Sequence, residues 1–179
     1  FEHYSGHVEL QYLPDGLHPS PGIPQGYSQE PLKRFDWKPR YDLEKRISPP
    51  DLTKYEPVEE KRFRHPPVMR LLIPIIQLAQ GTRDKSYLVR DKQGTIVARH
   101  GYSIPRRKKG YNEIFIRLDP EHGDLAPYLV DFLLNQVTIL SPGRKVQFSI
   151  PLWMESVLDA GKKAGFESRM TMRRMGIVL

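Results

Sequence analysis

The sequence contains no cysteine among its 179 residues. Disulfide bonds, thiolate nucleophiles and zinc or iron–sulfur sites with cysteine ligands are therefore excluded for this chain. A long hydrophobic run is also missing, because the longest apolar stretch covers only residues 66–79 and is interrupted by Arg70 and Pro74. We therefore expect no contact with a membrane. No two histidines follow the H-E-x-x-H pattern, glycine motifs that bind nucleotides are absent, and we expect no metal site.

The net charge of +7 is distributed unevenly along the chain. Residues 1–66 have a net charge of −1, and residues 67–179 have a net charge of +8. Prolines show the opposite distribution, since twelve of the seventeen precede residue 75. The chain is thus divided into a proline-rich front and a basic back with regular patterns.

The front part predicts one strand and a connector. Residues 7–13 alternate between polar and apolar side chains, which is typical of a strand with one buried face. Residues 14–31 contain five prolines and three glycines, so we expect neither a ladder nor a helix there. We therefore divide the chain into a strand at 1–13, a linker at 14–39 and a domain at 40–179. An isolated strand is unstable, so residues 1–13 must pair with a sheet.

Two helices are predicted before residue 82. Ser48 is a suitable N-cap for the first helix, with proline and Asp51 in its first turn. Its buried stripe would consist of Leu52, Tyr55, Val58 and Phe63. A second helix is expected over residues 67–80, where apolar residues recur with a helical period.

From residue 86 the hydrophobic period changes to two, which predicts strands. A hairpin is expected over residues 86–104 and a further strand over 111–118. A helix would follow from Leu125, with Asp124 as its N-cap. The remaining chain predicts a strand at 146–150, a helix at 152–164 and one or two strands at 166–179. This order indicates an α+β, or mixed α/β, domain.

Three stretches resemble the GNAT superfamily of acyl-CoA-dependent N-acyltransferases. The sequence Leu118-Asp119-Pro120-Glu121 resembles the exit from the fourth strand of that family into its acyl-CoA loop. A helix follows this loop directly. The stretch Lys163-Ala164-Gly165-Phe166 resembles the K-x-G-F sequence that often precedes the last strands of the family.

The resemblance implies a twisted, mostly antiparallel central sheet flanked by helices, and transfer of an acetyl or other acyl group from acyl-CoA to a small-molecule or protein amine. In such a fold the fourth strand and its neighbour splay apart, and the pantetheine arm adds to the exposed strand edge. The residues that would contact the cofactor are Ile116, Arg117, Leu118, Glu121, His122, Gly123, Asp124, Leu125 and Ala126. The front strand resembles the last strand of a preceding GNAT-like domain, so a tandem protein or a dimer partner is expected, in the cytoplasm.

The sequence also departs from the family pattern. The loop that should approach the pyrophosphate contains one glycine, two acids and Pro127, whereas the family loop is rich in glycine. Many members of the family have a tyrosine near the end of the last helix, which acts as the acid that protonates the thiolate. This sequence has no tyrosine at the corresponding place. Both departures imply weak acyl-CoA binding by this domain, or none.

Individual site residues have alternative interpretations. Glu113 lies where the family often has a base, and its alternative interpretation is an outward, solvated strand residue. His122 could contact phosphate or lie on a loop surface. The basic run Arg106, Arg107, Lys108 and Lys109 could attract the phosphates of CoA or nucleic acid, or form a solvated loop.

The alternative function is therefore a non-catalytic GNAT-like scaffold whose basic face meets an acidic protein or nucleic acid. Nucleic acid is the less favoured partner, because aromatic residues are not interleaved with the basic run. Trp153 belongs either to the core or to the wall of a substrate cleft.

Overall fold

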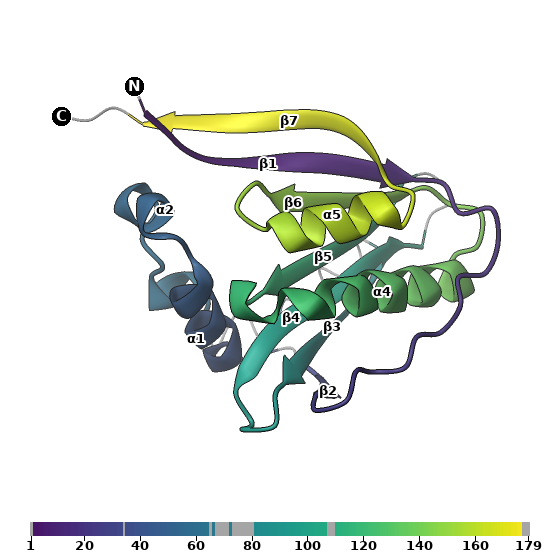
Figure 1. Ribbon diagram of the computed structural model, residues 1–179, viewed down its shortest axis with the longest axis horizontal. Coiled ribbons are helices and arrows are strands. Elements are labelled where there is room, and N and C mark those ends of the chain that lie inside the picture. The colour runs from purple at the N-terminus through teal and green to yellow at the C-terminus, as the bar shows by residue number, and fades with distance from the viewer. Residues whose placement is uncertain are drawn as a thin grey trace.

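A seven-stranded sheet forms the centre of the computed structural model, which describes residues 2–33, 35–64, 66, 72, 81–106 and 110–176 (Figure 1). The strand order is β2-β3-β4-β5-β6-β1-β7. The strands are β1 (Glu2–Tyr12), β2 (Ser28–Pro31), β3 (Thr82–Arg90), β4 (Ile96–Pro105), β5 (Asn112–Leu118), β6 (Val146–Pro151) and β7 (Glu167–Gly176). Within this described sheet, β5 and β6 run parallel and all other neighbours run antiparallel. The predicted fold class is confirmed.

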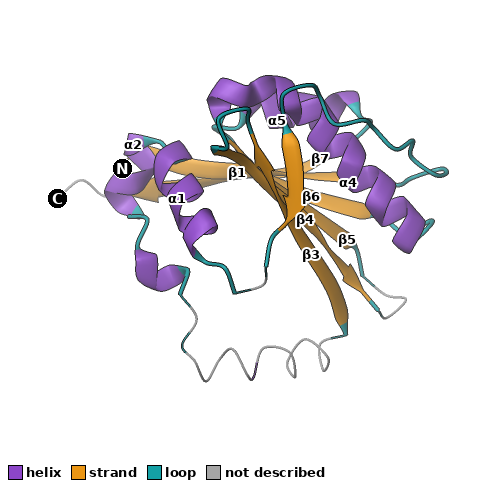
Figure 2. Ribbon diagram, turned by 90° about the horizontal axis from the view of Figure 1, so that it is seen from below, coloured by secondary structure: helices purple, strands orange, loops and turns teal. Residues whose placement is uncertain are grey.

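Helices flank the sheet as two separate pairs, which lie well apart (Figure 2). Helices α4 (Ala126–Leu140) and α5 (Glu155–Lys163) pack against each other, and α4 covers β4 and β5. Helices α1 (Lys38–Ile47) and α2 (Pro50–Tyr55) contact β4 and β1, respectively. Two short 3₁₀ helices, η1 (Glu60–Arg62) and η2 (Pro120–Leu125), complete the described elements. No helix in the described ranges combines the length and the apolar character that crossing a bilayer requires.

The alternation along β5 decides which side chains reach each face of the sheet. Its even-numbered residues, from Asn112 to Leu118, are buried in the core that α4 and α5 cover. The odd-numbered residues Glu113, Phe115 and Arg117 are exposed or half-buried and lie on the opposite face. Because side chains alternate across a strand, one strand supplies both the core and the surface under α1 and α2.

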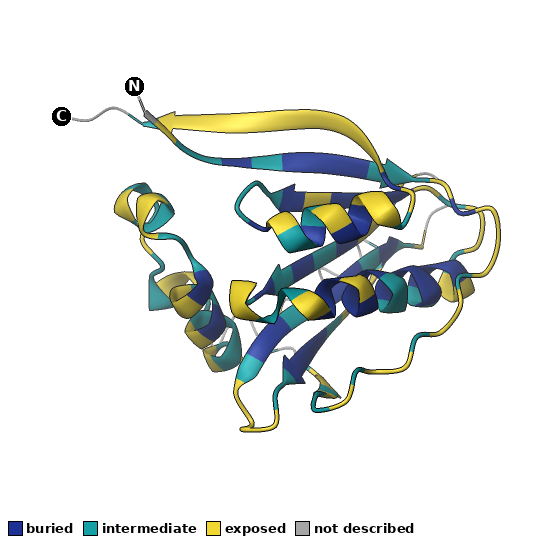
Figure 3. Ribbon diagram, viewed as in Figure 1, coloured by how far each residue is buried: buried dark blue, intermediate teal, exposed yellow. Residues whose placement is uncertain are grey.

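Strand β1 lies inside the sheet although it begins the chain. It pairs with β6 on one side and with β7 on the other. Val8 and Leu10 are buried, whereas β7 is exposed along almost its whole length as an edge strand (Figure 3). The predicted strand is confirmed and begins earlier, at Glu2. Its origin in a preceding domain remains a prediction.

The prediction that residues 14–31 cannot form a ladder was wrong. Strand β2 lies within this segment and pairs with β3. A proline is tolerated there because β2 is at the sheet edge, where no further strand needs its missing N–H group. Helix α1 also begins inside the expected linker, at Lys38. It was missed because Leu43 and Ile47 are its buried residues, too few for a clear periodic pattern.

Two predicted helix starts were also misplaced. Ser48 ends α1 instead of starting α2, and Pro49 takes the N-cap position of α2. Helix α2 ends at Tyr55 and has no buried residue, so the predicted buried stripe was wrong. Asp124 belongs to η2, and Leu125 is the N-cap of α4.

The other predicted elements agree with the structure in kind. The hairpin corresponds to β3 and β4, the strand at 111–118 to β5 and the strand at 146–150 to β6. The helix expected at 152–164 is the shorter α5, and the C-terminal segment forms the single strand β7. The helix predicted over residues 67–80 lies outside the described residues, apart from Leu72.

Candidate functional site

Strands β5 and β6 separate halfway along their length. They pair only over Asn112–Ile114 and Val146–Phe148. Beyond this point β5 keeps its pairing with β4, and β6 keeps its pairing with β1. The facing edges of residues 115–118 and 149–151 therefore have no strand partner among the described residues. Backbone N–H and C=O groups on such edges can accept an additional extended segment.

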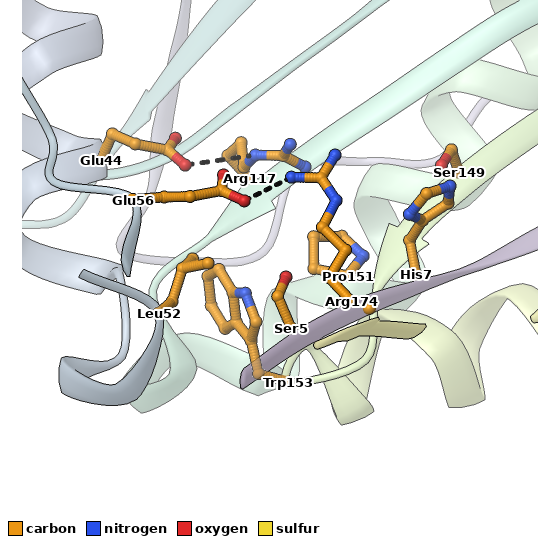
Figure 4. A pocket seen from close by; sticks show the side chains of 11 residues that line it. Ser5, His7, Glu44, Leu52, Glu56, Arg117, Ser149, Pro151, Trp153 and Arg174 are labelled. Carbon is orange, nitrogen blue, oxygen red and sulfur yellow. Dashed lines mark hydrogen bonds and ion pairs between the residues drawn. The ribbon is translucent and has the colours of Figure 1, made fainter. Parts of the chain in front are cut away.

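A cavity of about 360 Å³ lies next to this separation, on the face of α1 and α2 (Figure 4). Strands β1, β5, β6 and β7 form its floor, and residues of α1 and α2 and the chain after α2 close one side. Its lining residues are Ser5, Gly6, His7, Glu44, Leu52, Glu56, Arg117, Ser149, Pro151, Trp153 and Arg174. Trp153, for which the sequence left two interpretations, is thus part of a cleft wall.

Both carboxylates of this cleft are held by arginines. The side chain of Arg117 lies 3.6 Å from Glu44, measured from Nε to Oε1. Arg174 donates a hydrogen bond of 2.6 Å to Oε1 of Glu56, and Tyr4 donates another of 3.0 Å to the same atom. The hydrogen bond from Arg174 is the main reason that the pKa of Glu56 is lowered. Both carboxylates therefore belong to ion pairs, and neither is a free anionic group.

A second cavity, of about 270 Å³, adjoins the first and shares four of its lining residues. It lies between the sheet and the chain from Ser48 to Phe63, and Arg62, Arg99 and Arg117 line it. Burial is the main cause that lowers the pKa of Arg99 to about 10, and the positive charges of Arg40 and Arg117 lower it further. The lining of this cavity therefore contains three arginines and two carboxylates.

Glu113 lies on the same face of the sheet but in a different hollow. This third hollow has a volume of about 430 Å³ and also contains Tyr102, Gln147 and Ser149. Arg117 and Ser149 line both this hollow and the first cavity, so the two spaces meet where β5 and β6 separate. Glu113 is exposed and lies opposite Gln147, one residue before the last paired position.

The loop after β5 is folded as the 3₁₀ helix η2. The carboxylate of Asp119 accepts a hydrogen bond from the backbone N–H of Glu121, and the N–H of His122 bonds to the carbonyl of Asp119. Asp119 also forms an ion pair with Arg46, at 3.0 Å. Pro120 and Pro127 have no N–H group. Several backbone donors of this loop are thus absent or already used within the loop.

The proline-rich segment packs against this loop and against α4. The Tyr27 hydroxyl lies 3.0 Å from Nδ1 of His122 and donates a longer bond, of 3.5 Å, to Asp124. His18 lies 3.0 Å from a carboxylate oxygen of Asp131, and its carbonyl accepts a bond from Asn135. The segment therefore occupies side chains that the resemblance assigned to cofactor binding.

The structure brings some of the predicted site residues together and separates others. The side chains of Ile116, Leu118, Leu125 and Ala126 are buried in the core, so only their backbones could contact a ligand. The exposed residues Glu121 and Asp124 belong to η2 together with His122 and Gly123. Arg106 is exposed at the end of β4, and the rest of the predicted basic run, residues 107–109, lies outside the described residues.

Several residues of the cleft were not predicted. Glu44, Glu56, Arg99 and His7 come from four different elements or loops and follow no sequence motif. Arg174 lies on the exposed edge strand β7 and also reaches the cleft. Within the described ranges, no group of three His, Asp or Glu residues is close enough to bind a metal ion.

The sequence matches no protein-family model, and no curated protein matches it either. Solved structures do resemble the fold. A GCN5-related N-acetyltransferase from Sphaerobacter thermophilus matches 99% of this chain with a TM-score of 0.61 and 16% identity. A tandem GNAT protein from the clavulanic acid biosynthesis pathway matches 97% with a TM-score of 0.57 and 16% identity. The chain spans 55% and 54% of the length of these two proteins.

A third solved structure with a similar fold is the spermidine N-acetyltransferase from Vibrio cholerae in complex with CoA and spermine. It matches 84% of this chain and 96% of its own, with a TM-score of 0.52 and 15% identity. The chain therefore has the fold of the GCN5-related N-acetyltransferases. The predicted GNAT resemblance is confirmed at the level of the fold.

Proposed function

We propose that this chain is an acyltransferase domain that transfers an acyl group from an acyl thioester to an amine bound in the cleft under α1 and α2. The observation on which this rests is the separation of β5 and β6. Both strands keep their outer partners, and the gap between them meets the first cavity and the third hollow. A thioester on one side of the gap and an amine on the other would lie close together.

The residues along the gap suit the acylated pantetheine arm of acyl-CoA, acetyl-CoA being the simplest case. On the side of β6, the backbone of residues 116–118 has no partner strand among the described residues and could bind the amide groups of the arm as an extra strand would. The bound thioester supplies the electrophilic carbonyl carbon. Ser149 and Arg117, which line both spaces, would border the reacting groups.

The loop from Glu121 to Ala126 fits the pyrophosphate poorly. Glu121 and Asp124 repel an anion, Pro127 supplies no donor, and the N–H groups of Glu121 and His122 already have acceptors in Asp119. We therefore propose that the chain by itself binds acyl-CoA weakly and gains little from the nucleotide part of the molecule.

Glu113 is the proposed acceptor of the proton that the amine loses. Glu44 and Glu56 are less suitable, because each is paired with an arginine and a carboxylate in an ion pair is a weaker base. Glu113 has no such partner among the described residues, and its hollow meets the cleft through Arg117 and Ser149. It could act directly or through a water molecule.

Titration calorimetry with S-acetyl-pantetheine and with acetyl-CoA tests this proposal. We expect both to bind with nearly the same affinity, and with a dissociation constant of about 1 mM. Ser149→Trp should abolish binding of both, because a large side chain at this exposed position would fill the gap. The matched control is Ser168→Trp, an exposed serine on β7 away from the gap, which should bind normally.

Two results would contradict the proposal. The gap is not a thioester site if neither thioester binds at a concentration about ten times the expected dissociation constant. The same conclusion follows if the Ser149→Trp variant binds the thioesters as well as the control variant does. Low-micromolar binding of acetyl-CoA alone would instead overturn the interpretation of the loop.

The alternative, a non-catalytic basic module, has less support from the described residues. Two of the arginines on β7 are engaged within the chain, since Arg169 pairs with Glu9 and Arg174 pairs with Glu56. Binding of an acidic partner would therefore compete with these ion pairs.

A further inference from the structure

The second cavity contains an arginine whose charge is not balanced by a partner. Arg99 lies on β4, is half-buried and opens onto this cavity. Its guanidinium lies over the ring of Phe115, 4.9 Å from the ring centre. It makes no hydrogen bond or ion pair with any residue that the structure describes. Removing a charge from water without such a partner is costly, so a ligand with the opposite charge would be strongly favoured there.

The charges around the cavity do not compensate Arg99. The carboxylate of Glu44 favours the charged form of Arg99, but Glu44 also faces Arg117 at 3.6 Å. Glu56 is bonded to Arg174. With Arg62 also in the wall, four arginines face two carboxylates across the two joined cavities. The space next to the acceptor cleft thus has an excess of positive charge.

A buried hydroxyl group without a partner among the described residues belongs to the wall of the same cavity. Ser48 lines the second cavity, and its hydroxyl oxygen is buried with no hydrogen-bond partner among the described residues. A serine hydroxyl can donate to an anionic oxygen, and a guanidinium offers several N–H groups in a planar fork. Arg99 and Ser48 therefore lack an acceptor among the described residues, and Arg117, paired with Glu44, lies in the same cavity wall.

We propose that the second cavity binds an anionic oxygen group of the acceptor, a carboxylate or a phosphate. The acceptor would then be an amine that also bears an anion, with the anion beside Arg99 and the amine in the first cavity. This inference rests on the proposed function for the amine, but the binding of the anion does not depend on the thioester. A polyamine would be disfavoured in these two joined cavities, because both carboxylates that line them are already paired with arginines.

Binding of four small amines without any thioester tests the inference. The probes are β-alanine, phosphoethanolamine, propylamine and spermidine, measured by titration in NMR spectra of the labelled chain. We expect β-alanine, phosphoethanolamine or both to bind, and propylamine and spermidine to bind at least about tenfold more weakly. The better of the two anionic probes identifies the anion as carboxylate or phosphate.

Arg99→Met provides the specific variant, because methionine keeps much of the aliphatic volume and removes the charge. We expect affinity for the anionic probe to fall at least about tenfold, while the thermal unfolding midpoint without ligand stays the same or rises. The control is Arg83→Met, which removes an exposed arginine of β3 outside these cavities and should leave the affinity unchanged.

A purely structural arginine would behave differently. Replacing such an arginine would lower the thermal unfolding midpoint and leave the affinity for the probes unchanged. That result would overturn the inference. Equal binding of propylamine and β-alanine, or tightest binding of spermidine, would also overturn it. Because these titrations contain no thioester, their outcome is separate from that of the acyl-pantetheine experiment.

Discussion

Lowering the pH should destabilise the fold through His100. This residue lies on β4 and is fully buried, with its ring stacked on Tyr87 and edge-on to Phe132. Its Nε2 lies 2.9 Å from the amide oxygen of Gln29 on β2, and the Tyr128 hydroxyl donates to the same oxygen. Burial lowers the pKa of His100 from 6.5 to about 3. The folded state therefore keeps this histidine neutral.

The sign of the pH effect follows from the two pKa values. In the unfolded chain the imidazole takes up a proton below about pH 6.5. In the folded chain it takes up a proton only near pH 3. The contribution of His100 to the free energy of unfolding is therefore fully present above pH 6.5, and it decreases as the pH falls from 6.5 toward 3. At pH 5 the loss is about 2 kcal/mol relative to pH 8, a value insensitive to the folded pKa as long as that pKa is below about 4.

Urea unfolding at pH 8 and pH 5 measures this loss, with His100→Gln as the comparison. The variant side chain is neutral at both pH values and can still donate to Gln29, so the contributions of other groups remain. We expect the wild type to lose about 2 kcal/mol more than the variant between the two pH values. If the glutamine variant does not fold, His100→Phe keeps the ring stack and serves the same purpose. Equal losses in wild type and variant would refute the reasoning.

Three further predictions concern other parts of the molecule. Gly101→Ala should lower the free energy of unfolding in urea by about 3 kcal/mol, because a Cβ atom there would lie 2.8 Å from the Phe115 ring. The control is Gly16→Ala, which has open space around it and should change the free energy of unfolding by less than about 0.5 kcal/mol. Arg169→Met should lower the free energy of unfolding, because it leaves the buried carboxylate of Glu9 without its ion pair, and the double variant with Glu9→Gln should recover part of that loss in the same assay. Glu113→Gln should lower the rate of acyl transfer to an amine about 100-fold with thioester affinity unchanged, whereas an unchanged rate would remove Glu113 from the mechanism.

Much of the sheet could be predicted because its strands alternate regularly. In β5 the buried even-numbered positions and the exposed or half-buried odd ones are visible directly in the residues. The same holds for β6 and for α4, where buried residues recur with a helical period. Such patterns arise because one face of each element is buried in the core, and the buried positions can be recognised from neighbouring residues in the sequence.

The missed elements lack this signal. Helix α1 has two buried residues, and strand β2 has none. Both form because the rest of the chain offers a surface and a strand edge, so their stability comes from tertiary contacts rather than from local preference. The same reason explains why Ser48, a good N-cap by composition, ends a helix instead.

The sequence by itself determined the alternating strands and the helix α4, because each depends on residues close together in the chain. Tertiary structure alone decided the cleft. Arg99, Glu44, Glu56 and Arg174 are brought together from four segments far apart in the sequence, and the separation of β5 and β6 depends on which strands lie beside them. Charges that meet only through folding leave no pattern in the linear order of residues, so their balance becomes visible only in three dimensions.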